Sequence, residues 1–357
     1  MNTLTHRVLP GLHATVSTIG AGCWTIGGPA TNCGVPIGWD DVTDDEAYRG
    51  LMRACELGIT LYDTADVYGL GRSERLIGRM LNHVRRDDVV VSSKVGYFTG
   101  TSRHAYEPHQ VRHQLATTLD NLNTDHLDIY ILHSTDFGAD DRYLDRTIEQ
   151  LREFRQQKMI RAIGMRAPHA FAEEWAAKSG GRATDTRRWL HLFHRIRPDV
   201  VTVRYNLLSP LYSSDETDIF SFAQRHHIGV LIKQALGQGR LLRQRSTAYR
   251  TFSTGDHRTA DPSFLPTELR RLDERLAPLR DRFGTRLQDI IRIALRYVIQ
   301  HAPHAAVLVG FRNAEQIQAL VGSLGDPLTE DEMIEIRALL HPNTSAAERF
   351  DRAVHRG

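Results

Sequence analysis

The sequence predicts an α/β fold in which eight parallel strands close into a barrel. Short, β-branched apolar segments alternate with segments of helical periodicity along most of the 357 residues, a pattern typical of parallel strands joined by helical crossovers. The strand segments are apolar at nearly every position, as in a sheet that is covered on both faces. Eight such repeats within about 300 residues suit a closed (β/α)8 barrel, the TIM-barrel architecture, better than an open sheet.

The predicted elements follow one another in a regular order. The eight strands are predicted over Val16–Gly20, Thr60–Ala65, Val89–Val95, Leu127–His133, Arg161–Met165, Val200–Tyr205, Gly229–Ala235 and Ala305–Gly310. Helical periodicity predicts helices over Asp44–Leu57, His109–Leu122, Ile148–Lys158, Thr217–His226, Leu287–His301 and Ala314–Leu324. The first helix begins with an acidic turn, and Ala47, Leu51 and Ala54 lie at the spacing of one apolar face.

Four segments go beyond the repeat: long loops after strands one, five and seven, and an extra C-terminal helix. They are Gly27–Asp40, Phe171–Arg197, Gln244–Pro266 and Thr329–Leu340. The loops that follow strands build the active sites of barrels, so the first three are candidate walls of a site. For Phe171–Arg197, which a Gly-Gly pair interrupts, an ordinary surface insertion explains the pattern equally well.

The length alone favours two domains, but α/β barrels of this size are often single units. The barrel therefore predicts a single domain over 1–357, with a barrel core at about 16–325 and a C-terminal helix and tail over 326–357. Charged residues make up 25% and hydrophobic residues 41% of the chain, which excludes wholesale disorder. The net charge of +2 is too small to indicate a nucleic-acid binder. The three cysteines, and the lack of a signal-peptide core or a long apolar run, lead us to expect a cytoplasmic protein without a membrane span.

Four reactive side chains follow three consecutive strands. Asp63 and Tyr68 come at and after the end of the second strand, and Lys94 and His133 end the third and fourth. The C-terminal ends of parallel strands meet at one end of a barrel, so these side chains can converge. A tyrosine has a pKa near 10, too high for an efficient proton donor, and a nearby ammonium lowers it. A carboxylate can hold that lysine, and a histidine can orient a carbonyl oxygen. Each residue alone is more often structural, but the four together favour catalysis.

The sequence around these residues resembles a known family. Leu61–Gly69, followed by Ser73–Gly78, is similar to the signature of the aldo-keto reductases, and Lys94 and His133 fit the same pattern. The resemblance extends over about Ile19–Leu324 and includes the order of the eight units. It implies an (α/β)8 barrel that reduces carbonyls or oxidises alcohols with NADP or NAD and without a metal.

The resemblance also implies roles for single residues. Tyr68 corresponds to the general acid–base, Lys94 to the residue that lowers its pKa, Asp63 to the partner of Lys94, and His133 to the residue that orients the substrate carbonyl. Trp24 stands where the family places an aromatic wall over the substrate, although a tryptophan there can also simply cover the core.

Two further segments match the family's cofactor site, which has no Rossmann glycine fingerprint. The segment 236–241 matches the one that surrounds the pyrophosphate, where glycines allow backbone N–H groups close to phosphate oxygens. The segment 310–316 matches the adenosine-phosphate segment and opens a helix, whose N-terminus favours anions. Arg312 can pair with a 2′-phosphate, which favours NADPH over NADH, although a surface arginine is an equal explanation. The resemblance thus assigns cofactor contacts to Gly22, Leu236, Gly237, Gly239, Leu241, Gly310, Arg312 and Gln316.

Other positions depart from the family pattern. Arg166 and Ala167 replace a Ser-Asn pair that holds the nicotinamide, Thr202 replaces a glutamine, Lys233 replaces a stacking tyrosine, and Ala319-Leu320 replace the Glu-Asn that grips the adenine.

Three explanations remain open for the new cations. Arg166 and Lys233 can rebuild the cofactor clamp, or they can bind an anionic group of the substrate together with Arg204. Alternatively, Arg166 forms an ion pair with a carboxylate of the barrel.

These observations predict an NADP(H)-dependent oxidoreductase that reduces a small aldehyde or ketone with polar, sugar-like or anionic character. Two other functions remain open. One is an epimerase or isomerase that keeps its NADP(H) and shows no net turnover of it. The other is a non-catalytic, nucleotide-sensing regulatory subunit, which would not need all four reactive residues. No zinc-binding combination of residues is visible, and the sequence leaves the oligomeric state open.

Overall fold

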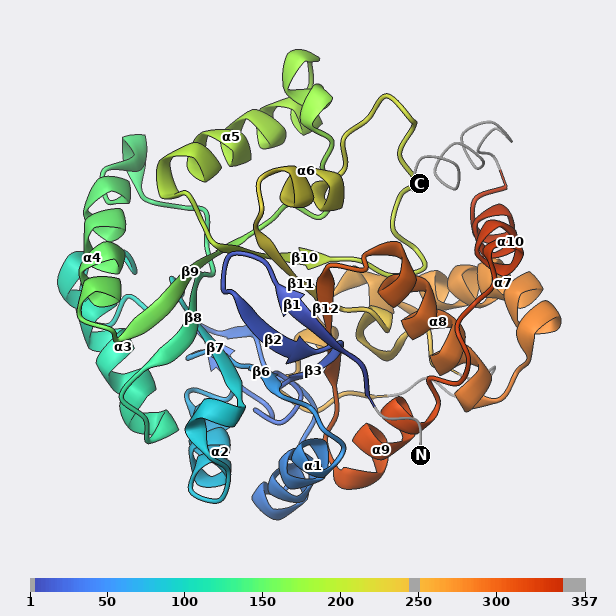
Figure 1. The fold of residues 1–357 in the computed structure, drawn as a ribbon, viewed down its shortest axis with the longest axis horizontal. Coiled ribbons are helices and arrows are strands. Elements are labelled where there is room, and N and C mark those ends of the chain that lie inside the picture. Colours follow the sequence, from blue (N-terminus) through green and yellow to red (C-terminus); the bar gives the residue numbers. More distant parts are fainter. Residues whose placement is uncertain (1–3, 244–250, 343–357) are drawn as a thin grey trace.

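The computed structural model describes residues 4–243 and 251–342, and it confirms the closed barrel. Eight parallel strands are hydrogen-bonded in a ring (Figure 1). In order around the ring they are β3 (Ile19–Gly22), β6 (Leu61–Asp63), β7 (Val90–Val95), β8 (Leu127–Leu132), β9 (Ile160–Arg166), β10 (Val200–Arg204), β11 (Gly229–Lys233) and β12 (Ala305–Gly310). The ring closes where β12 pairs with β3, with Gly310 opposite Gly22.

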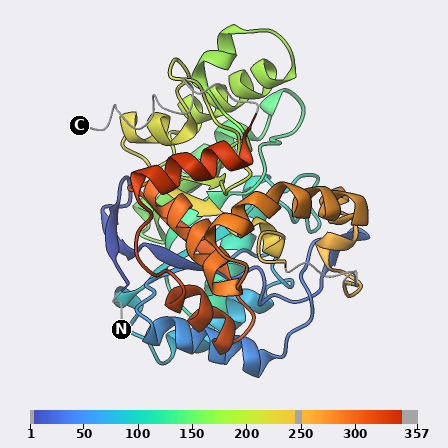
Figure 2. The same cartoon turned by 90° about the vertical axis from the view of Figure 1, so that its right-hand side faces the viewer.

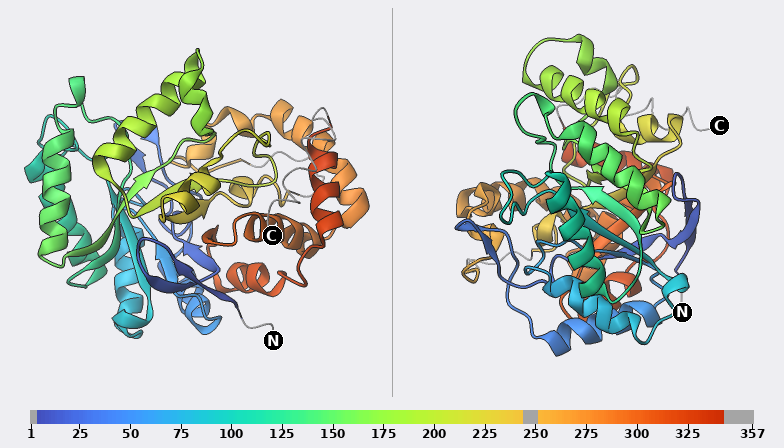
Figure 3. Two further views of the ribbon diagram at one scale, coloured as in Figure 1. Left: turned by 45° about the horizontal axis from the view of Figure 1, so that its top comes forward. Right: turned by 90° about the vertical axis from the view of Figure 1, so that its left-hand side faces the viewer.

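An outer layer of helices surrounds the strands (Figures 1 and 3). The helices are α1 (Asp44–Glu56), α2 (Arg72–Leu81), α3 (Pro108–Leu122), α4 (Leu144–Gln156), α5 (Gly181–Ile196), α6 (Ile219–Arg225), α7 (Pro266–Phe283), α8 (Leu287–His301), α9 (Ala314–Gly322) and α10 (Glu330–Leu340). Helix α1 begins where predicted because Thr43 and Glu46 form a capping box. The extra C-terminal helix is confirmed as α10, which packs on α7 (Figure 2). None of the described helices is long and apolar enough to cross a membrane.

The first predicted strand is wrong in its boundaries. Val16–Gly20 is divided between two elements, since Ala14–Ser17 is strand β2 of an antiparallel hairpin with β1 (His6–Leu9), and the barrel strand begins only at Ile19. The division lies at Ser17, whose N–H donates to Thr60 Oγ1 at 2.8 Å rather than to a neighbouring barrel strand. The hairpin lies across the barrel in Figure 1 and its apolar side chains join the barrel interior.

The three long loops differ in what they contain. Gly27–Asp40 is a loop as predicted, with a small hairpin of β4 (Thr31–Asn32) and β5 (Val35–Pro36). Phe171–Arg197 is a short 3₁₀ helix followed by α5, the outer helix of the fifth repeat, and its glycine pair marks the start of that helix. Residues 244–250 of the third segment and 343–357 of the predicted tail lie outside the described residues. Residues 255 and 256 contact the first loop, where Gly38 N–H donates to Gly255 O at 2.9 Å.

Arg7 fastens the N-terminal hairpin to the end of α8. Its guanidinium donates to three carbonyl groups, those of Ile299 at 3.0 Å, Ala302 at 2.8 Å and Ala305 at 2.6 Å. Because Arg7→Met leaves these carbonyls without their donor, we expect the free energy of unfolding in urea to fall by about 1–3 kcal/mol. The neighbouring exposed variant His6→Gln is the control, and an equal loss in both variants would contradict this role for Arg7.

Candidate active site

The barrel interior defines a layer of residues at the C-terminal ends of the strands. Interior side chains such as Leu61, Ile131 and Leu231 pack into one apolar cluster with the N-terminal hairpin. Side chains alternate between the two faces of a strand, so residues an even number of positions further along point to the same interior. Each strand contributes one residue to this inward-facing layer, either at its C-terminal end or directly after it. The eight residues are Gly22, Asp63, Lys94, His133, Arg166, Arg204, Lys233 and Gly310.

Asp63 and Lys94 form a buried ion pair in this layer. Lys94 Nζ lies 2.8 Å from Asp63 Oδ2, and the side chains are only 3% and 8% exposed. Lys94 also donates to Thr64 O at 2.5 Å, and Ser92 Oγ donates to Asp63 Oδ1 at 2.7 Å. Burial alone would lower the pKa of Lys94, but Asp63 and Tyr68 outweigh it, so the net pKa is raised. Lys94 is therefore held as an ammonium.

Tyr68 lies beside this ammonium, at 4.6 Å from Lys94 Nζ to the ring centre. Its backbone is fixed in a turn before α2, with its N–H donating to Ala65 O at 3.0 Å. Gly27 packs against the same backbone, and a Cβ added there would lie 2.8 Å from the carbonyl carbon of Tyr68. Sequence reasoning could not predict this contact, because Gly27 and Tyr68 belong to different loops.

The pKa of Tyr68 is raised, whereas the sequence predicts that Lys94 lowers it. Burial raises it to about 12, while the charge of Lys94 and a hydrogen bond from it lower it by less. The predicted effect of Lys94 is thus present, but the net shift is upward because the buried phenolate loses its hydration.

His133 follows β8 and is neutral. Its backbone N–H donates to Val95 O at 2.8 Å. Burial, followed by the positive charges of Lys94, Lys233 and Arg166, lowers the pKa of His133 well below its ordinary value. Its Nδ1 atom is buried without a hydrogen-bond partner among the described residues. The ring stands edge-on to Tyr68 and Tyr97, at 6.3 Å and 4.6 Å between centroids. A neutral imidazole can donate one hydrogen bond, as the orientation of a carbonyl oxygen requires.

An aromatic cluster adjoins Tyr68. The ring of Trp24 stacks on that of Tyr68 with 5.9 Å between centroids, and Trp24 Nε1 donates to Ile37 O at 2.9 Å. Trp39 and His257 also pack on Trp24, at 5.2 Å and 4.2 Å. Sequence reasoning missed these two residues, although both come from segments it expected to be site walls.

Three cations of the layer lie on neighbouring strands. Arg204 and Lys233 face each other in the pairing of β10 and β11, and Arg166 ends β9. No carboxylate of the described residues lies within 4.0 Å of any of the three, and the Arg166 guanidinium lies beside His169, at 3.4 Å between Nη2 and Nε2. This excludes the ion pair with a barrel carboxylate for Arg166. Burial, followed by Arg166 and Lys94, lowers the pKa of Lys233 to about 7.

The residues that match the cofactor segments occupy two places. In the turn after β11, the N–H groups of Gly237 and Gly239 donate to backbone carbonyls of the same turn, at 2.8 Å and 3.0 Å. The side chains of Leu236 and Leu241 are buried in the core, which leaves only their backbone for contact with a ligand.

The second place is the N-terminus of α9, next to Gly310. Gln316 Oε1 accepts the Arg312 N–H at 2.9 Å, and Arg312 Nη1 lies 3.5 Å from Asp40 Oδ2. A helix N-terminus with a guanidinium beside it suits the phosphates of a dinucleotide. The donor chemistry therefore fits such a cofactor.

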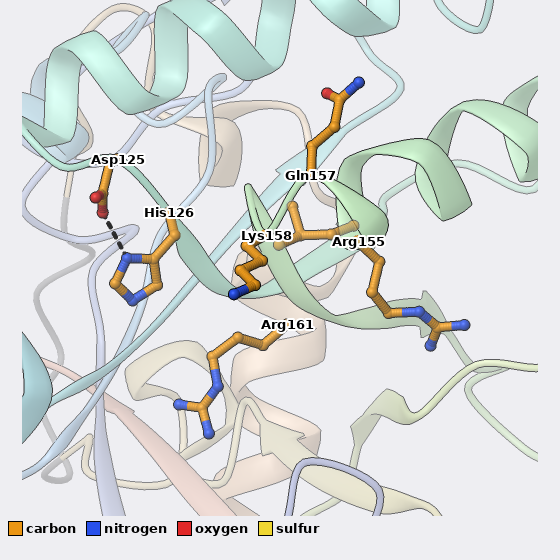
Figure 4. Close-up of a pocket in the computed structure, with 7 residues that line it drawn as sticks. Asp125, His126, Arg155, Gln157, Lys158 and Arg161 are labelled. Atoms are coloured by element: carbon orange, nitrogen blue, oxygen red, sulfur yellow. Dashed lines mark hydrogen bonds and ion pairs between the residues drawn. The ribbon is translucent and has the colours of Figure 1, made fainter.

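A cavity of about 620 Å³ lies at the other end of the barrel, where β8 and β9 begin (Figure 4). Its arginines are already paired, since Arg155 contacts Asp199 at 3.2 Å and Arg161 contacts Asp128 at 2.6 Å. It contains none of the reactive residues described above.

Comparison with known proteins identifies the family of the chain. The model of the aldo/keto reductase family matches residues 18–341. The aldo-keto reductase YhdN of Bacillus subtilis is 29% identical, with 92% of this chain and 91% of that protein covered. The NADH-specific methylglyoxal reductase of Escherichia coli is 24% identical, with 91% and 95% covered.

Solved structures show the same fold. A glycerol dehydrogenase from Gluconobacter oxydans has a TM-score of 0.70 at 23% identity, with 97% of this chain and 98% of that chain covered. An aldo/keto reductase from Klebsiella pneumoniae, in complex with NADP and acetate, has a TM-score of 0.63 at 20% identity, with 94% and 95% covered. Since the family model matches nearly the whole barrel, the chain belongs to the aldo/keto reductase family of oxidoreductase enzymes.

Proposed function

We propose that this protein reduces an aldehyde or ketone that carries polar groups, with NADP(H) as cofactor and Tyr68 as proton donor. The observation that carries the proposal is the contact of Tyr68 with the buried Lys94–Asp63 pair, with His133 beside the same ring. An isolated tyrosine on a barrel loop would need no such support.

Each residue contributes one part of the proton transfer. Tyr68 Oη donates its proton to the carbonyl oxygen, which becomes the hydroxyl of the alcohol. Lys94 stabilises the phenolate left behind, and Asp63 keeps Lys94 charged and in place. His133 donates a hydrogen bond to the same oxygen and so fixes its orientation. Trp24 forms an apolar wall beside Tyr68.

The cofactor is held by residues at the C-terminal end of the barrel. Arg312 and the N-terminus of α9 would hold phosphate, and the turn 236–241 would contribute backbone contacts to the pyrophosphate. When bound, the reduced nicotinamide supplies the hydride. The NADP complex of the Klebsiella protein supports this choice, whereas the E. coli relative is NADH-specific. Arg312 is the residue on which the proposed preference for NADPH rests.

Titration of the purified protein with NADPH and NADH, followed by nicotinamide fluorescence, tests the cofactor. We expect NADPH to bind more tightly than NADH. Arg312→Gln should weaken NADPH binding by roughly tenfold, because a charge-assisted contact with the 2′-phosphate is lost. Arg270→Gln, an exposed arginine of α7, is the control. The same loss of affinity for both cofactors would contradict the role of Arg312, and no binding of either would contradict the proposed function.

A further inference from the structure

We propose that the substrate carries an anionic group, a carboxylate or phosphate separate from its carbonyl, and that Arg166, Arg204 and Lys233 bind this group at the C-terminal mouth of the barrel. The inference rests on the proposed function and names its substrate class. It is carried by the position of the three side chains on adjacent strands, and by the lack of a carboxylate beside them in residues 4–243 and 251–342.

The inward-facing layer has a strong excess of positive charge. Its eight residues include four cations, Lys94, Arg166, Arg204 and Lys233, but one carboxylate, Asp63, which is already paired with Lys94. Asp261 acts on Arg204 electrostatically from another segment, although the two residues form no ion pair. Cations gathered in this way repel one another, and an anion between them removes that cost.

The three cations are close enough to share one ligand. Adjacent strands lie about 4.8 Å apart, and the pairing places Arg204 opposite Lys233 and Thr202 opposite Arg166. Long arginine and lysine side chains from three successive strands can therefore reach one carboxylate or phosphate. An arginine binds such groups with two parallel hydrogen bonds, and a lysine with a single ammonium.

The position of His133 relates this group to the reacting carbonyl. β9 is the neighbour of β8, after which His133 comes, so the three cations lie on the side of His133 opposite Asp63 and Lys94. A carbonyl held by Tyr68 and His133 thus has its other end directed toward Arg166, Arg204 and Lys233. The substrate class that fits is an aldehyde or ketone with an acidic group at its far end.

The phosphates of the cofactor are the other source of negative charge. The residues proposed to hold them, Arg312 and the segment 236–241, lie after the ends of β12 and β11 rather than in the inward-facing layer. We assign the three cations of the layer to the substrate, and the experiment separates this assignment from one in which they hold the cofactor.

Lys233 makes the binding of an anion measurable as an uptake of protons. Its surroundings are mostly cationic, and its pKa is about 7. The charged and titratable groups that act on it or that it acts on are Arg166, Lys94, Asp63, Arg204, His133 and His169. A bound anion favours the ammonium form and raises the pKa of Lys233. Above pH 7, anion binding should therefore take up a proton, and affinity should fall as the pH rises.

The test compares two aldehydes that differ at one group, the anionic 4-carboxybenzaldehyde and its neutral methyl ester, with NADPH as cofactor. We expect a higher kcat/KM for the carboxylate. In Arg204→Gln the ratio of the two kcat/KM values should fall about tenfold or more, since a charge-assisted contact is lost. Arg270→Gln should keep the wild-type ratio, and thermal unfolding checks that both variants are folded. An unchanged ratio in Arg204→Gln would overturn the proposal.

Two more measurements separate the alternatives. If Arg204→Gln weakens NADPH binding and leaves the ratio unchanged, the cations hold a cofactor phosphate, and the proposal is wrong. If neither aldehyde is reduced, the proposed function fails, and calorimetry with 4-(hydroxymethyl)benzoate and its methyl ester tests the anion site alone. Binding of the carboxylate that depends on Arg204 supports the site, and equal binding of acid and ester overturns it.

Calorimetry of the same carboxylate at pH 7.5 in triethanolamine and in Tris, two buffers without an anionic group that differ in ionisation enthalpy, measures the protons taken up. We expect uptake in the wild type and in Arg204→Gln, but none in Lys233→Met. No uptake in the wild type would remove Lys233 from the site.

Discussion

Tyr68→Phe is expected to reduce kcat/KM for carbonyl reduction by roughly 100-fold to 10,000-fold, the range that general acid catalysis contributes. The substitution removes one oxygen atom and leaves the ring that packs on Trp24 and lies beside Lys94. The binding of cofactor should therefore be retained while the proton donor is lost. Because the phenol has no role in binding the dinucleotide, kcat should fall far more than the affinity for NADPH.

Steady-state kinetics and a fluorescence titration with NADPH test this separation. Tyr48→Phe, on helix α1 and far from the reactive residues in the fold, is the matched control and should behave as the wild type. Full activity of Tyr68→Phe would refute Tyr68 as proton donor. Loss of NADPH binding to the same extent as activity would instead indicate that Tyr68 supports the cofactor site.

The sequence predicts the barrel well because its signals are local. Each strand is a short apolar run, and the C-terminal ends of parallel strands meet at one end of a barrel. This is why Asp63, Lys94 and His133, placed at three strand ends, could be expected to meet. The helices α2 and α7 were missed, since their charged surfaces hide a narrow apolar face.

Features that depend on two distant segments could not be predicted. The contacts of Trp24 with Trp39 and His257 join residues from the loops after β3 and β11. The raised pKa of Tyr68 depends on how completely the surrounding loops bury it, and no motif records that. The replacements at Arg166 and Lys233 are visible in the sequence, but only the structure shows that no described carboxylate pairs with them.

Lys94→Met is expected to destabilise the protein as well as to lower its activity. The variant leaves the Asp63 carboxylate buried without its cation, and breaking a buried ion pair in this way costs about 3–5 kcal/mol. The remaining hydrogen bond from Ser92, at 2.7 Å, cannot replace the lost charge. The double variant with Asp63→Asn removes the isolated charge as well. It should recover part of the lost stability but none of the activity, because the phenolate of Tyr68 still lacks its ammonium.

Urea unfolding of the wild type, both single variants and the double variant gives the coupling energy of the pair. Arg53→Met is the comparison, since Arg53 and Glu56 form a surface pair at 2.7 Å whose side chains are 34% and 59% exposed. The free energy of unfolding of Arg53→Met should fall by less than about 1 kcal/mol relative to the wild type. If Lys94→Met loses no more than Arg53→Met, the interior pair does not stabilise the fold. If the double variant is less stable than either single variant, the isolated carboxylate is not the source of the loss. Stability recovered without activity would show that Lys94 is needed for the proton transfer itself and that the fold needs only the balance of charge around it.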